Sequence, residues 1–481
     1  MPGVAAGPRS GRVSRGTSTI LRSEPFLAST NLASNSLTLG INRPTKYGSN
    51  PVAFSGLSTS DPNYGIGNNT AMTHPTDPNK TLFFHNSGDS AFTGVVVTYA
   101  ESTDGTTLTR PTVGTVNWGG STSNNIIWPT GGGDTSAGSG TDRVLCGNVI
   151  YDATDRLWYM VARPSSAWAS LIYSASSPTG SWSLAKTVYA AHATSPSRDA
   201  QHLVRRSDGR WLLYYQRTET GLPQTGAPSG YYQGYRRSLG VFLSDTTSLT
   251  GAWTDVGAVL SSTSADRQYY GTGAWVDGQW LYVPVMIFDG TDSVPTTTSG
   301  SYPNTYNAIH KLSLYVAPAS DGTTLTLADD AWLSRTGVYG EWDGGEITNG
   351  HNIVKSGNDW RFYFGGDGNT HHQSPENIRK LGFATIGYRR IGGVSGTGSV
   401  TTTTVSAPQG GALYVNGTNI SNVELLDGSN NVLSGYGTAN AVPADAYEHR
   451  VSWGAVTGVP TSFRVRVTVS SGAVNHVEVR S

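Results

Sequence analysis

One unit recurs along this chain: a short apolar strand, a turn rich in Asp, Asn or Gly, and a strand of aromatic residues. It occurs five times, with copies that begin at Ala71, Asn148, Gln201, Gly273 and Asn352. The turns at 208–209 and 277–278 contain Asp-Gly, which supplies the positive φ angles that tight hairpins need. Repetition over such a long period indicates an architecture built from equal parts.

A second hairpin follows several copies and ends in a Ser/Thr/Gly turn before a Trp or Leu. The same six residues, DGTTLT, stand at 104–109 and at 321–326. Two hairpins make four strands, which is one blade of a propeller. The sequence therefore predicts an all-β protein with a five-bladed β-propeller over residues 59–394. A β-sandwich or a solenoid would also have many strands, but neither predicts this pairing of hairpins.

Two further segments flank the predicted propeller. Residues 1–58 form an N-terminal extended arm and lead-in segment. Residues 395–411 read SGTGSVTTTTVSAPQGG, which is typical of a linker. Short alternating strands with Asn and Gly turns follow, so residues 395–481 are predicted to form a small C-terminal β-sandwich-like module. Its expected role is to brace the propeller, with glycan binding or assembly contacts as the alternatives.

Composition excludes several classes of protein. With 60 glycines and only 14% charged residues, the chain is poorly suited to a helical bundle. A net charge of −1 gives no electrostatic footprint for nucleic acid or an anionic membrane. No apolar run is long enough to span a bilayer. Cys146 is the one cysteine, which excludes an internal disulfide and a cysteine-based zinc site.

The N-terminal arm carries basic residues among Gly, Ser and Pro. They are Arg9, Arg12, Arg15 and Arg22. The apolar stretch beside them is too short for a secretory signal. The arm is either a solvated tail or a docking segment that orders on a larger assembly. We expect an extracellular or virion-associated protein without a signal peptide or a transmembrane segment.

Carboxylates precede the first strand of several predicted blades, where side chains face the mouth of the central channel. They are Asp142, Asp199, Asp266, Glu341, Asp343 and Glu346. Two convergent carboxylates are what glycoside hydrolysis requires: one protonates the leaving oxygen, and the other attacks or activates water. An Asp before a strand is also a common turn former, and Asp-Arg neighbours are often ordinary ion pairs.

Two stretches resemble known families of five-bladed propeller glycoside hydrolases. RDAQHLVRRSDGRWLLYYQ, at 198–216, is similar to a blade of the arabinanase/β-xylosidase family, and NGHNIVKSGNDWRFYFGG, at 349–366, looks like the last blade of that family. Arg198-Asp199 also resembles the Arg-Asp pair of the invertase/levansucrase family. These resemblances imply that Asp199 stabilises the transition state or tunes the general acid. They also imply that His351 lies beside a channel calcium or water cluster.

More of the chain resembles a branch of invertase-like propellers that carry a C-terminal β-module. The matching stretches include AESTDGTTLTRPTVGTVNWGG, YRRSLGVFLSDTTSLTGAWTDVG and GEWDGGEI, and in the C-terminal module LYVNG, VELLD and VSW. Together they cover most of residues 95–481. The resemblance implies the order of the domains and a carbohydrate-active propeller.

The residues divide into expected roles. Glu346 or Glu341 is the general acid, and Asp266 or Asp142 is the base or nucleophile. Arginines that hold sugar hydroxyls or an acidic sugar, and further substrate-binding residues, are Arg198, Arg236, Arg267, Asp343, Tyr269, Tyr270, Trp342 and Trp118. For most tryptophans, packing between blades is the alternative. His371-His372 and His351 form no zinc signature, and calcium would need six to eight oxygens.

Two functions remain open. The first is a glycoside hydrolase that cleaves a polysaccharide at the channel mouth. The second is a non-catalytic glycan- or receptor-binding protein of a virion, such as a phage tail or capsid appendage, whose arm contacts neighbouring virion proteins. A purely structural scaffold is the third alternative. The expected partner is a polysaccharide or cell-surface glycan, without nucleic acid or membrane.

Overall fold

The computed structural model describes residues 18–19, 27–29, 36–52, 60–63, 65–88, 95–114, 116–118, 120–128, 144–164, 169–189, 198–220, 235–262, 267–289, 309–338, 341–368, 380–456 and 458–480. Every regular element in these ranges is a β-strand. Within them, no helix has the length and hydropathy that a membrane span requires. The prediction of an all-β protein is confirmed.

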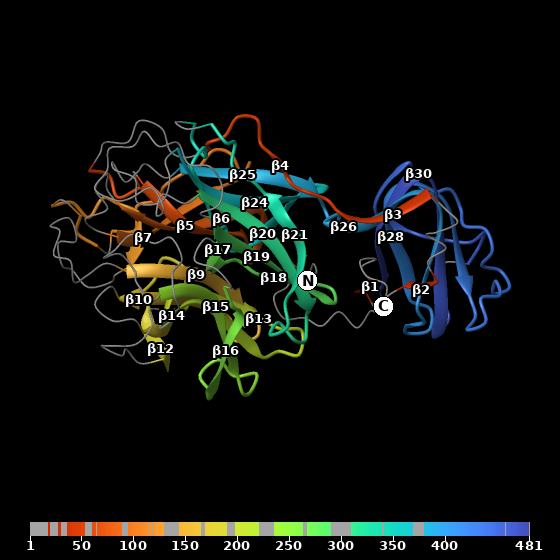
Figure 1. The fold of residues 1–481 in the computed structure, drawn as a ribbon, viewed down its shortest axis with the longest axis horizontal. Coiled ribbons are helices and arrows are strands. Elements are labelled where there is room, and N and C mark those ends of the chain that lie inside the picture. The colour runs from red at the N-terminus through yellow and green to blue at the C-terminus, as the bar shows by residue number, and fades with distance from the viewer. Residues whose placement is uncertain are drawn as a thin grey trace.

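Five sheets follow one another along the chain, and the strands of the first four pair in sequence order (Figure 1). We call them blades one to five. Blade one contains β5 (Gly65–His74), β6 (Asp77–Gly88), β7 (Val95–Ser102) and β8 (Ile126–Trp128). Blade two contains β9 (Val144–Asp152), β10 (Leu157–Pro164), β11 (Ser170–Ala175) and β12 (Ser183–Tyr189). Blade three contains β13 (Arg198–Arg205), β14 (Trp211–Thr220), β15 (Tyr235–Ser244) and β16 (Trp253–Leu260).

The last two blades have a divided inner strand. Blade four contains β17 (Arg267–Thr272), β18 (Trp275–Asp277), β19 (Trp280–Asp289), β20 (Ile309–Pro318) and β21 (Thr326–Leu333). Blade five contains β22 (Glu346–Thr348), β23 (Ile353–Ser356), β24 (Asp359–Asp367) and β25 (Lys380–Gly387). Its outermost strand is β4 (Thr45–Lys46), which comes from the N-terminal part of the chain. The N-terminal lead-in thus completes the last blade.

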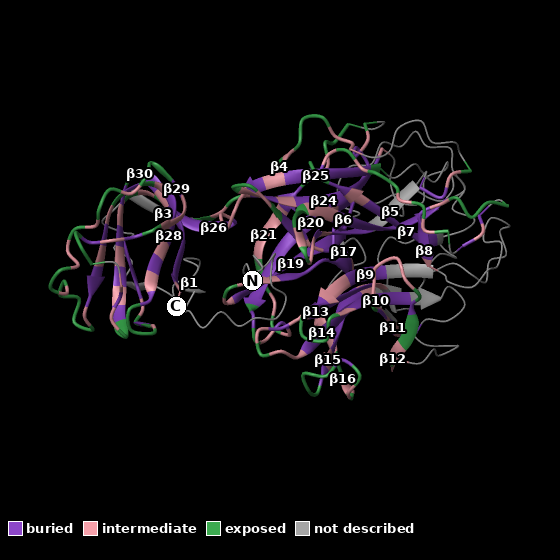
Figure 2. Ribbon diagram, turned by 180° about the vertical axis from the view of Figure 1, so that it is seen from behind, coloured by how far each residue is buried: buried purple, intermediate pink, exposed green. Residues whose placement is uncertain are grey.

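The inner strands of the blades contact one another around a common centre, with β5 next to β9, β9 next to β13, β13 next to β17, and β23 next to β5. Blades four and five meet through β20 and β22. This closed ring is a β-propeller, in agreement with the sequence prediction. Figure 2 shows that the strands within the propeller are largely buried. Large aromatic side chains fill the spaces between blades, including Trp211, Tyr215, Trp332 and Phe362, all nearly inaccessible to solvent. Each such side chain contributes about 2–3 kcal/mol of burial free energy.

The two DGTTLT turns occupy equivalent places. Each follows the third strand of its blade and packs on the second strand of the preceding blade. The hydroxyl of Tyr363 in β24 donates to the carbonyl of Gly105, 2.8 Å away, and that of Tyr214 in β14 donates to the carbonyl of Gly322. Both glycines have positive φ, 73° and 71°. The two identical hexapeptides therefore form the same kind of turn and make the same contact with the preceding blade, which is direct evidence of repetition.

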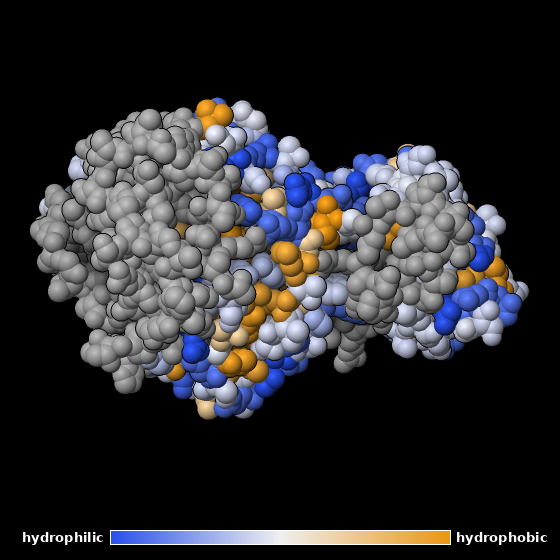
Figure 3. All heavy atoms as spheres, in the orientation of Figure 1, coloured by the Kyte–Doolittle hydropathy of each residue, from blue (hydrophilic) through white to orange (hydrophobic). Residues whose placement is uncertain are grey.

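The outer strands of the propeller are more exposed than the inner ones. Val256 in β16 and Leu327 in β21 expose 44% and 47% of their surface. Figure 3 shows an apolar stripe on one face of the propeller, within an otherwise mainly hydrophilic described surface. Apolar residues at the surface are common, because a protein has too few polar atoms to cover itself.

A second, eight-stranded sheet forms the C-terminal domain. It contains β26 (Gly392–Thr402), β27 (Val405–Ser406), β28 (Ala412–Leu426), β29 (Asp445–Arg450) and β30 (Ser462–Arg480), joined by β1 (Ser18–Thr19), β2 (Leu27–Ser29) and β3 (Ser36–Ile41). Its own core is rich in valine. Three strands from the N-terminal segment thus pair into this sheet. Within residues 1–22, on which the docking-arm prediction rests, the structure describes Ser18–Thr19, which form β1, and the other residues lie outside the described part of the chain.

One sequence expectation was wrong in this region. The Gly/Ser/Thr stretch predicted as a linker is mostly strand β26, which pairs with both β3 and β30. The strand forms because Val394 and Val400 are buried in the domain core, and Thr401 and Thr402 are β-branched residues that suit a strand. The boundary predicted between 394 and 395 falls inside β26. The three-part division of the chain remains a prediction.

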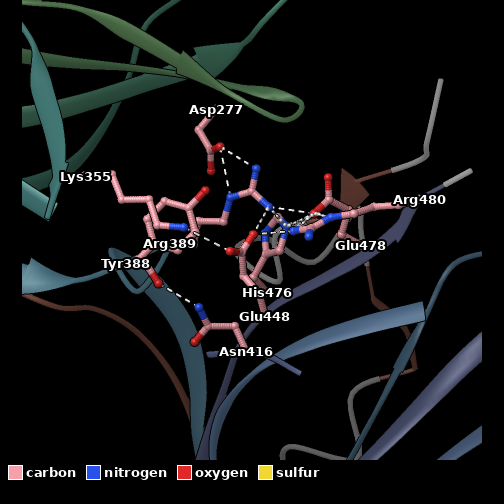
Figure 4. A network of polar contacts seen from close by, with 9 residues as sticks. All are labelled: Asp277, Lys355, Tyr388, Arg389, Asn416, Glu448, His476, Glu478 and Arg480. Carbon is pink, nitrogen blue, oxygen red and sulfur yellow. Dashed lines mark hydrogen bonds and ion pairs between the residues drawn. The ribbon is translucent and has the colours of Figure 1, made fainter. Parts of the chain in front are cut away.

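The turn after β25 joins the two domains through a network of charged groups (Figure 4). Arg389 lies between them, with Nη2 2.9 Å from Asp277 Oδ1 at the end of β18 and Nη1 2.6 Å from Glu478 Oε2 in β30. Lys355 in β23 pairs with Glu448 in β29 at 3.0 Å. We call these five groups, with His476 and Arg480, the interdomain clamp. It holds the C-terminal domain against one end of the propeller.

Candidate functional site

The inner strands of all five blades begin at the same end of the propeller, which we call the mouth. The first residues of β13, β17 and β22 are Arg198, Arg267 and Glu346, so these three residues occupy equivalent places in blades three, four and five. The clamp lies at the opposite end, because Asp277 ends β18 and Lys355 is near the end of β23. The mouth is therefore the end of the propeller opposite the clamp.

The inner strands are irregular close to the mouth. The register shifts between Ile66 and Asn69, between Asp199 and His202, and between Tyr269 and Gly271. In blade five the inner strand is interrupted at the same level, because β22 ends at Thr348 and β23 begins at Ile353. Bulges of this kind bend a strand and redirect its side chains, and they are frequent beside functional sites. Irregularity at one level in four blades therefore marks this end of the channel.

Glycines allow the inner strands to approach closely below the mouth. A Cβ on Gly147 would lie 2.1 Å from the carbonyl oxygen of Gln201, and one on Gly273 would lie 2.2 Å from that of Gly350. Backbone oxygens cannot come so near to a side chain, so only glycine fits these positions. The centre of the propeller is consequently packed at these positions.

Two histidines fill this packed centre. The rings of His202 and His351 have centroids 5.2 Å apart, and His351 Nδ1 lies 3.4 Å from the hydroxyl of Thr70. Burial lowers the pKa of His202 to about 3. Burial, and secondarily His202, holds the pKa of His351 well below its ordinary value. Both imidazoles are therefore neutral.

The surroundings of His351 do not fit the calcium ion that the family resemblance implied. Calcium binds six to eight oxygens, usually including carboxylates. Among the described residues, no group of three or more His, Cys, Asp or Glu side chains could hold a metal. His371 and His372 lie outside the described residues. We derive no chemical step through a metal.

A pair of carboxylates lies at the mouth end of blade five. Glu346 in β22 and Asp367 in β24 are direct partners in the antiparallel register. Residues opposite each other in this way have Cβ atoms about 5 Å apart. Glu346 exposes 1% of its surface and Asp367 exposes 4%. Two acidic side chains are thus held side by side and largely away from bulk water.

Blade four supplies the other groups around Glu346. His310 in β20 places Nδ1 3.5 Å from Glu346 Oε1. The His310 ring also contacts Tyr270 and Phe288, with centroid distances of 5.1 and 5.5 Å. Glu346 therefore has a histidine beside it, and aromatic rings hold that histidine in place.

Blade three adds an arginine to this group. The guanidinium of Arg237 in β15 lies over Tyr270 and Phe288, 5.0 and 5.3 Å from their ring centroids. Its backbone N–H donates to Gln268 Oε1 at 3.1 Å. We call Arg237, Gln268, Tyr270, Phe288, His310, Glu346 and Asp367 the Glu346 cluster. It joins three blades at the mouth and combines a cation, aromatic rings, a histidine and two carboxylates.

The structure places the predicted site residues in three groups. Glu346 and Tyr270 belong to the cluster. Asp199, Arg198, Arg267 and Arg236 lie on strands at the mouth, although their side chains are outside the described residues, as are Asp142 and Asp266 altogether. In the register, Asp199 is opposite Gln216. The catalytic roles of these residues remain predictions.

The remaining predicted residues have other contacts. Glu341 is exposed in the turn before β22. Trp342 packs across the backbone of Gly366 and Gly382. Tyr269 contacts Tyr315 of the same blade with ring centroids 6.3 Å apart, edge to face.

Two assignments are corrected by the structure. Asp343 is fully buried and forms an ion pair with Lys46 of β4, so its carboxylate holds the N-terminal strand against blade five and does not face a substrate. Trp118 exposes 7% of its surface within an apolar cluster, and its indole N–H donates to the carbonyl of Ser60. It is a core residue, as the alternative reading of the tryptophans held, and not a stacking platform.

Sequence reasoning missed Asp367, His310, Phe288, Gln268 and Arg237. Asp367 could have been found from the sequence, because it ends the aromatic strand of the last repeated hairpin. That strand runs back to the end of the propeller at which the inner strand begins. His310 and Arg237 had none, because neither stands beside a recognisable motif. Their proximity to Glu346 depends on how neighbouring blades pack.

No protein-family model matches this chain, and no curated protein matches its sequence. Several solved structures are similar in fold. The catalytic domain of a Coprinopsis cinerea GH62 α-L-arabinofuranosidase is 13% identical, with a TM-score of 0.48 over 71% of this chain and 97% of that one. A glycosyl hydrolase from Bacteroides ovatus is 13% identical, with a TM-score of 0.45 over 76% and 98%. A Bacillus subtilis family 43 arabinoxylan arabinofuranohydrolase, in complex with cellotetraose, is 12% identical, with a TM-score of 0.39 over 92% and 99%.

Proposed function

We propose that this protein is a glycoside hydrolase that cleaves a polysaccharide at the mouth of its propeller. The observation that carries this proposal is the position of Glu346 and Asp367, two buried carboxylates opposite each other at the start of an inner strand. Two acids directly opposite each other in a sheet repel one another. A pair of carboxyl groups side by side is also what glycoside hydrolysis requires. A catalytic role accounts for the arrangement.

The chemistry needs a proton donor and a second carboxylate. Glycoside hydrolysis uses one carboxyl group to deliver a proton to the glycosidic oxygen. We assign this delivery to Glu346, with Asp367 as its neighbour and His310 as the group that orients it. The second carboxylate, which attacks the anomeric carbon or activates water, comes from Asp199, Asp142 or Asp266. Tyr270, which is half-buried, has a ring of the kind on which sugars stack.

A propeller that only binds glycans is the second candidate. Glu346 exposes 1% of its surface, so a sugar must displace neighbouring groups to reach it. A binding protein of a virion would need no such access. A hydrolase and a glycan-binding protein both bind the polysaccharide, but only the hydrolase cleaves it. An assay of cleavage therefore distinguishes the two functions.

The test is release of reducing ends from a panel of polysaccharides by the full chain. Glu346→Gln is expected to lower the rate by about a hundredfold or more, the usual contribution of a general acid. Glu341→Gln is the matched control, because Glu341 is an exposed glutamate five residues away in the same turn region. Binding without turnover by the wild-type protein would favour the virion-type function. Turnover that survives Glu346→Gln would overturn the assignment of the acid.

A further inference from the structure

One N-terminal segment ties the C-terminal domain to the outer edge of blade five. It leaves the C-terminal sheet at the end of β3 and continues along the blade as β4 (Figure 1). Past β4, the N–H of Tyr47 donates to the carbonyl of Phe383 at 3.0 Å, and that of Val52 donates to the carbonyl of Leu381 at 2.8 Å. We call residues 41–52 the strap. Because β4 is antiparallel to β25, which begins beside the end of β24, the strap runs from the clamp toward the mouth.

Lys46 of the strap reaches the turn that precedes Glu346. Its ammonium group forms an ion pair with the carboxylate of Asp343. The side chain of Asp343 is fully buried, whereas that of Lys46 is 23% exposed. A carboxylate buried to this degree needs a cation, because an uncompensated charge inside a protein is very unfavourable. The ion pair therefore fixes the place of Asp343 in the turn.

The same turn packs on the strand that carries Asp367. The ring of Trp342 covers Gly366 in β24 and Gly382 in β25, where a Cβ would lie 2.4 Å and 2.2 Å from ring atoms. Only glycine permits so close an approach, which lets the ring lie directly on the blade. Since Gly366 precedes Asp367, Trp342 holds the turn beside one of the two acids.

The backbone connects the turn to both acids. The N–H of Gly345, the last residue of the turn, donates to the carbonyl of Asp367 at 2.9 Å. Glu346 follows directly and is the cross-strand partner of Asp367. Asp343 stands three residues before Glu346 in the chain. A shift of Asp343 would therefore move the turn and, with it, the two acids relative to each other.

We propose that Lys46 is a positioning residue for the carboxylate pair. Through Asp343 it holds the turn of residues 341–345, and this turn sets the position of Glu346 against Asp367. The inference rests on the proposed function, to which it adds a residue outside the Glu346 cluster. An error of about 1 Å in the position of a reacting group can slow a reaction about a hundredfold. The strap is therefore part of what makes blade five competent for catalysis.

The test measures kcat and KM for reducing-end release by Lys46→Met in the full chain, at a temperature at which the variant is folded. The substrate is the one that the wild-type protein cleaves fastest among xylan, dextran, polygalacturonate and alginate. Without its cation, Asp343 is expected to move toward water and to draw the turn with it. We expect kcat to fall about ten- to a hundredfold while KM is unchanged, because only the geometry of the reacting groups is lost. Lys46→Arg keeps the charge and should restore most of kcat.

Arg43→Met is the matched control. Arg43 also anchors the strap by an ion pair, with Nε 2.8 Å from Asp329 Oδ2, but its partner belongs to β21 of blade four and lies outside the turn. This variant loosens the strap and should keep the wild-type kcat. If Lys46→Met does not fold, the double variant Lys46→Met/Asp343→Asn removes the uncompensated charge and carries the same expectation for kcat.

A further pair of variants shows whether Lys46 acts through Glu346. In a Glu346→Gln background, Lys46→Met should lower the residual rate only slightly, because residues that act as a unit are not additive. Equal losses in the two backgrounds would overturn the inference.

The outcomes separate this inference from the proposed function. Glu346-dependent cleavage with a wild-type kcat in Lys46→Met, even at a lowered melting temperature, would show a structural role only and would overturn the inference while the hydrolase stands. A loss of kcat that Arg43→Met shares would overturn it as well. Absence of cleavage by the wild-type protein would overturn the proposed function and the inference together.

Discussion

The two ends of the propeller use charged residues in opposite ways. At the clamp, each charge meets its opposite: Arg389 contacts Asp277 and Glu478, and Lys355 contacts Glu448. At the mouth, two acids, Glu346 and Asp367, are direct cross-strand partners.

The comparison distinguishes the charged residues that stabilise the fold from those for which we propose a catalytic role. Paired charges of opposite sign hold the two domains together and satisfy one another. Like-charged neighbours lower stability, and natural proteins keep such arrangements chiefly at functional sites. Variants at the two ends should therefore behave differently, and four of them test the contrast.

The largest effect on stability is expected from Arg389→Ala. This change leaves Asp277 and Glu478 without their main cation in a site where Arg389 exposes only 12% of its side chain. Breaking a buried pair from one side costs about 3–5 kcal/mol. Urea unfolding of the full chain measures the loss. Stability equal to that of the wild type would show that the clamp holds nothing together.

Gly273→Ala is expected to cost less, about 1–3 kcal/mol, as overpacking does. The new Cβ would meet the backbone oxygen of Gly350, which has no freedom to move aside. Gly428→Ala is the matched control, because no atom lies within 4 Å of its new Cβ. Thermal unfolding compares the two variants, and equal melting temperatures would contradict the close approach of the inner strands.

Acid should weaken the clamp gradually. Burial alone would raise the pKa of Glu448, but Lys355 and Arg480 hold it below its ordinary value. Burial alone would also raise the pKa of Glu478, but His476 and Arg389 hold it below its ordinary value. Carboxylates with lowered pKa values stabilise the fold above their unfolded pKa, near 4.3, and this stability is lost as the pH falls below it.

His476 acts in the same direction. Burial, and secondarily Arg389, lowers its pKa, so the unfolded state binds a proton more readily than the folded state below about pH 6.5. The melting temperature should therefore decline from pH 7 to pH 4. His476→Gln should flatten the upper part of this decline, and an unchanged profile would show that His476 does not contribute.

The smallest effect on stability is expected from Glu346→Gln. Removal of one charge from a like-charged pair should leave the free energy of unfolding within about 1 kcal/mol of the wild type, or raise it slightly. Urea unfolding beside Arg389→Ala makes the comparison directly. A loss as large as that of Arg389→Ala would mean that Glu346 is a structural residue like those of the clamp.

Much of the fold could be predicted from sequence because it is made of repeats. The hairpin copies and the two DGTTLT turns indicated blades, and the blades indicated that Glu346 lies just before an inner strand. Strand β26 was missed, since its glycines and threonines read as a linker when the partners β3 and β30 are unknown. Local composition cannot show pairing between segments more than 350 residues apart.

Only part of the candidate site could be predicted from the sequence, again because local sequence does not show contacts between distant segments. Glu346 stood in a recognisable place in its own blade, but His310 and Arg237 reach it from two other blades. Asp343 looked like a site carboxylate until its partner Lys46 was known. Contacts within one hairpin follow from sequence, whereas contacts between blades depend on how the whole ring packs.

The most direct test of the central claim is the rate of reducing-end release by Glu346→Gln, Asp367→Asn and the double variant on one cleaved polysaccharide. If the two carboxylates act as a unit, the double variant should be no slower than Glu346→Gln alone, because residues that act together are not additive. Independent, multiplying losses would contradict the pairing. Release of reducing ends by Glu346→Gln at the wild-type rate would contradict the assignment of the active site to the Glu346 cluster.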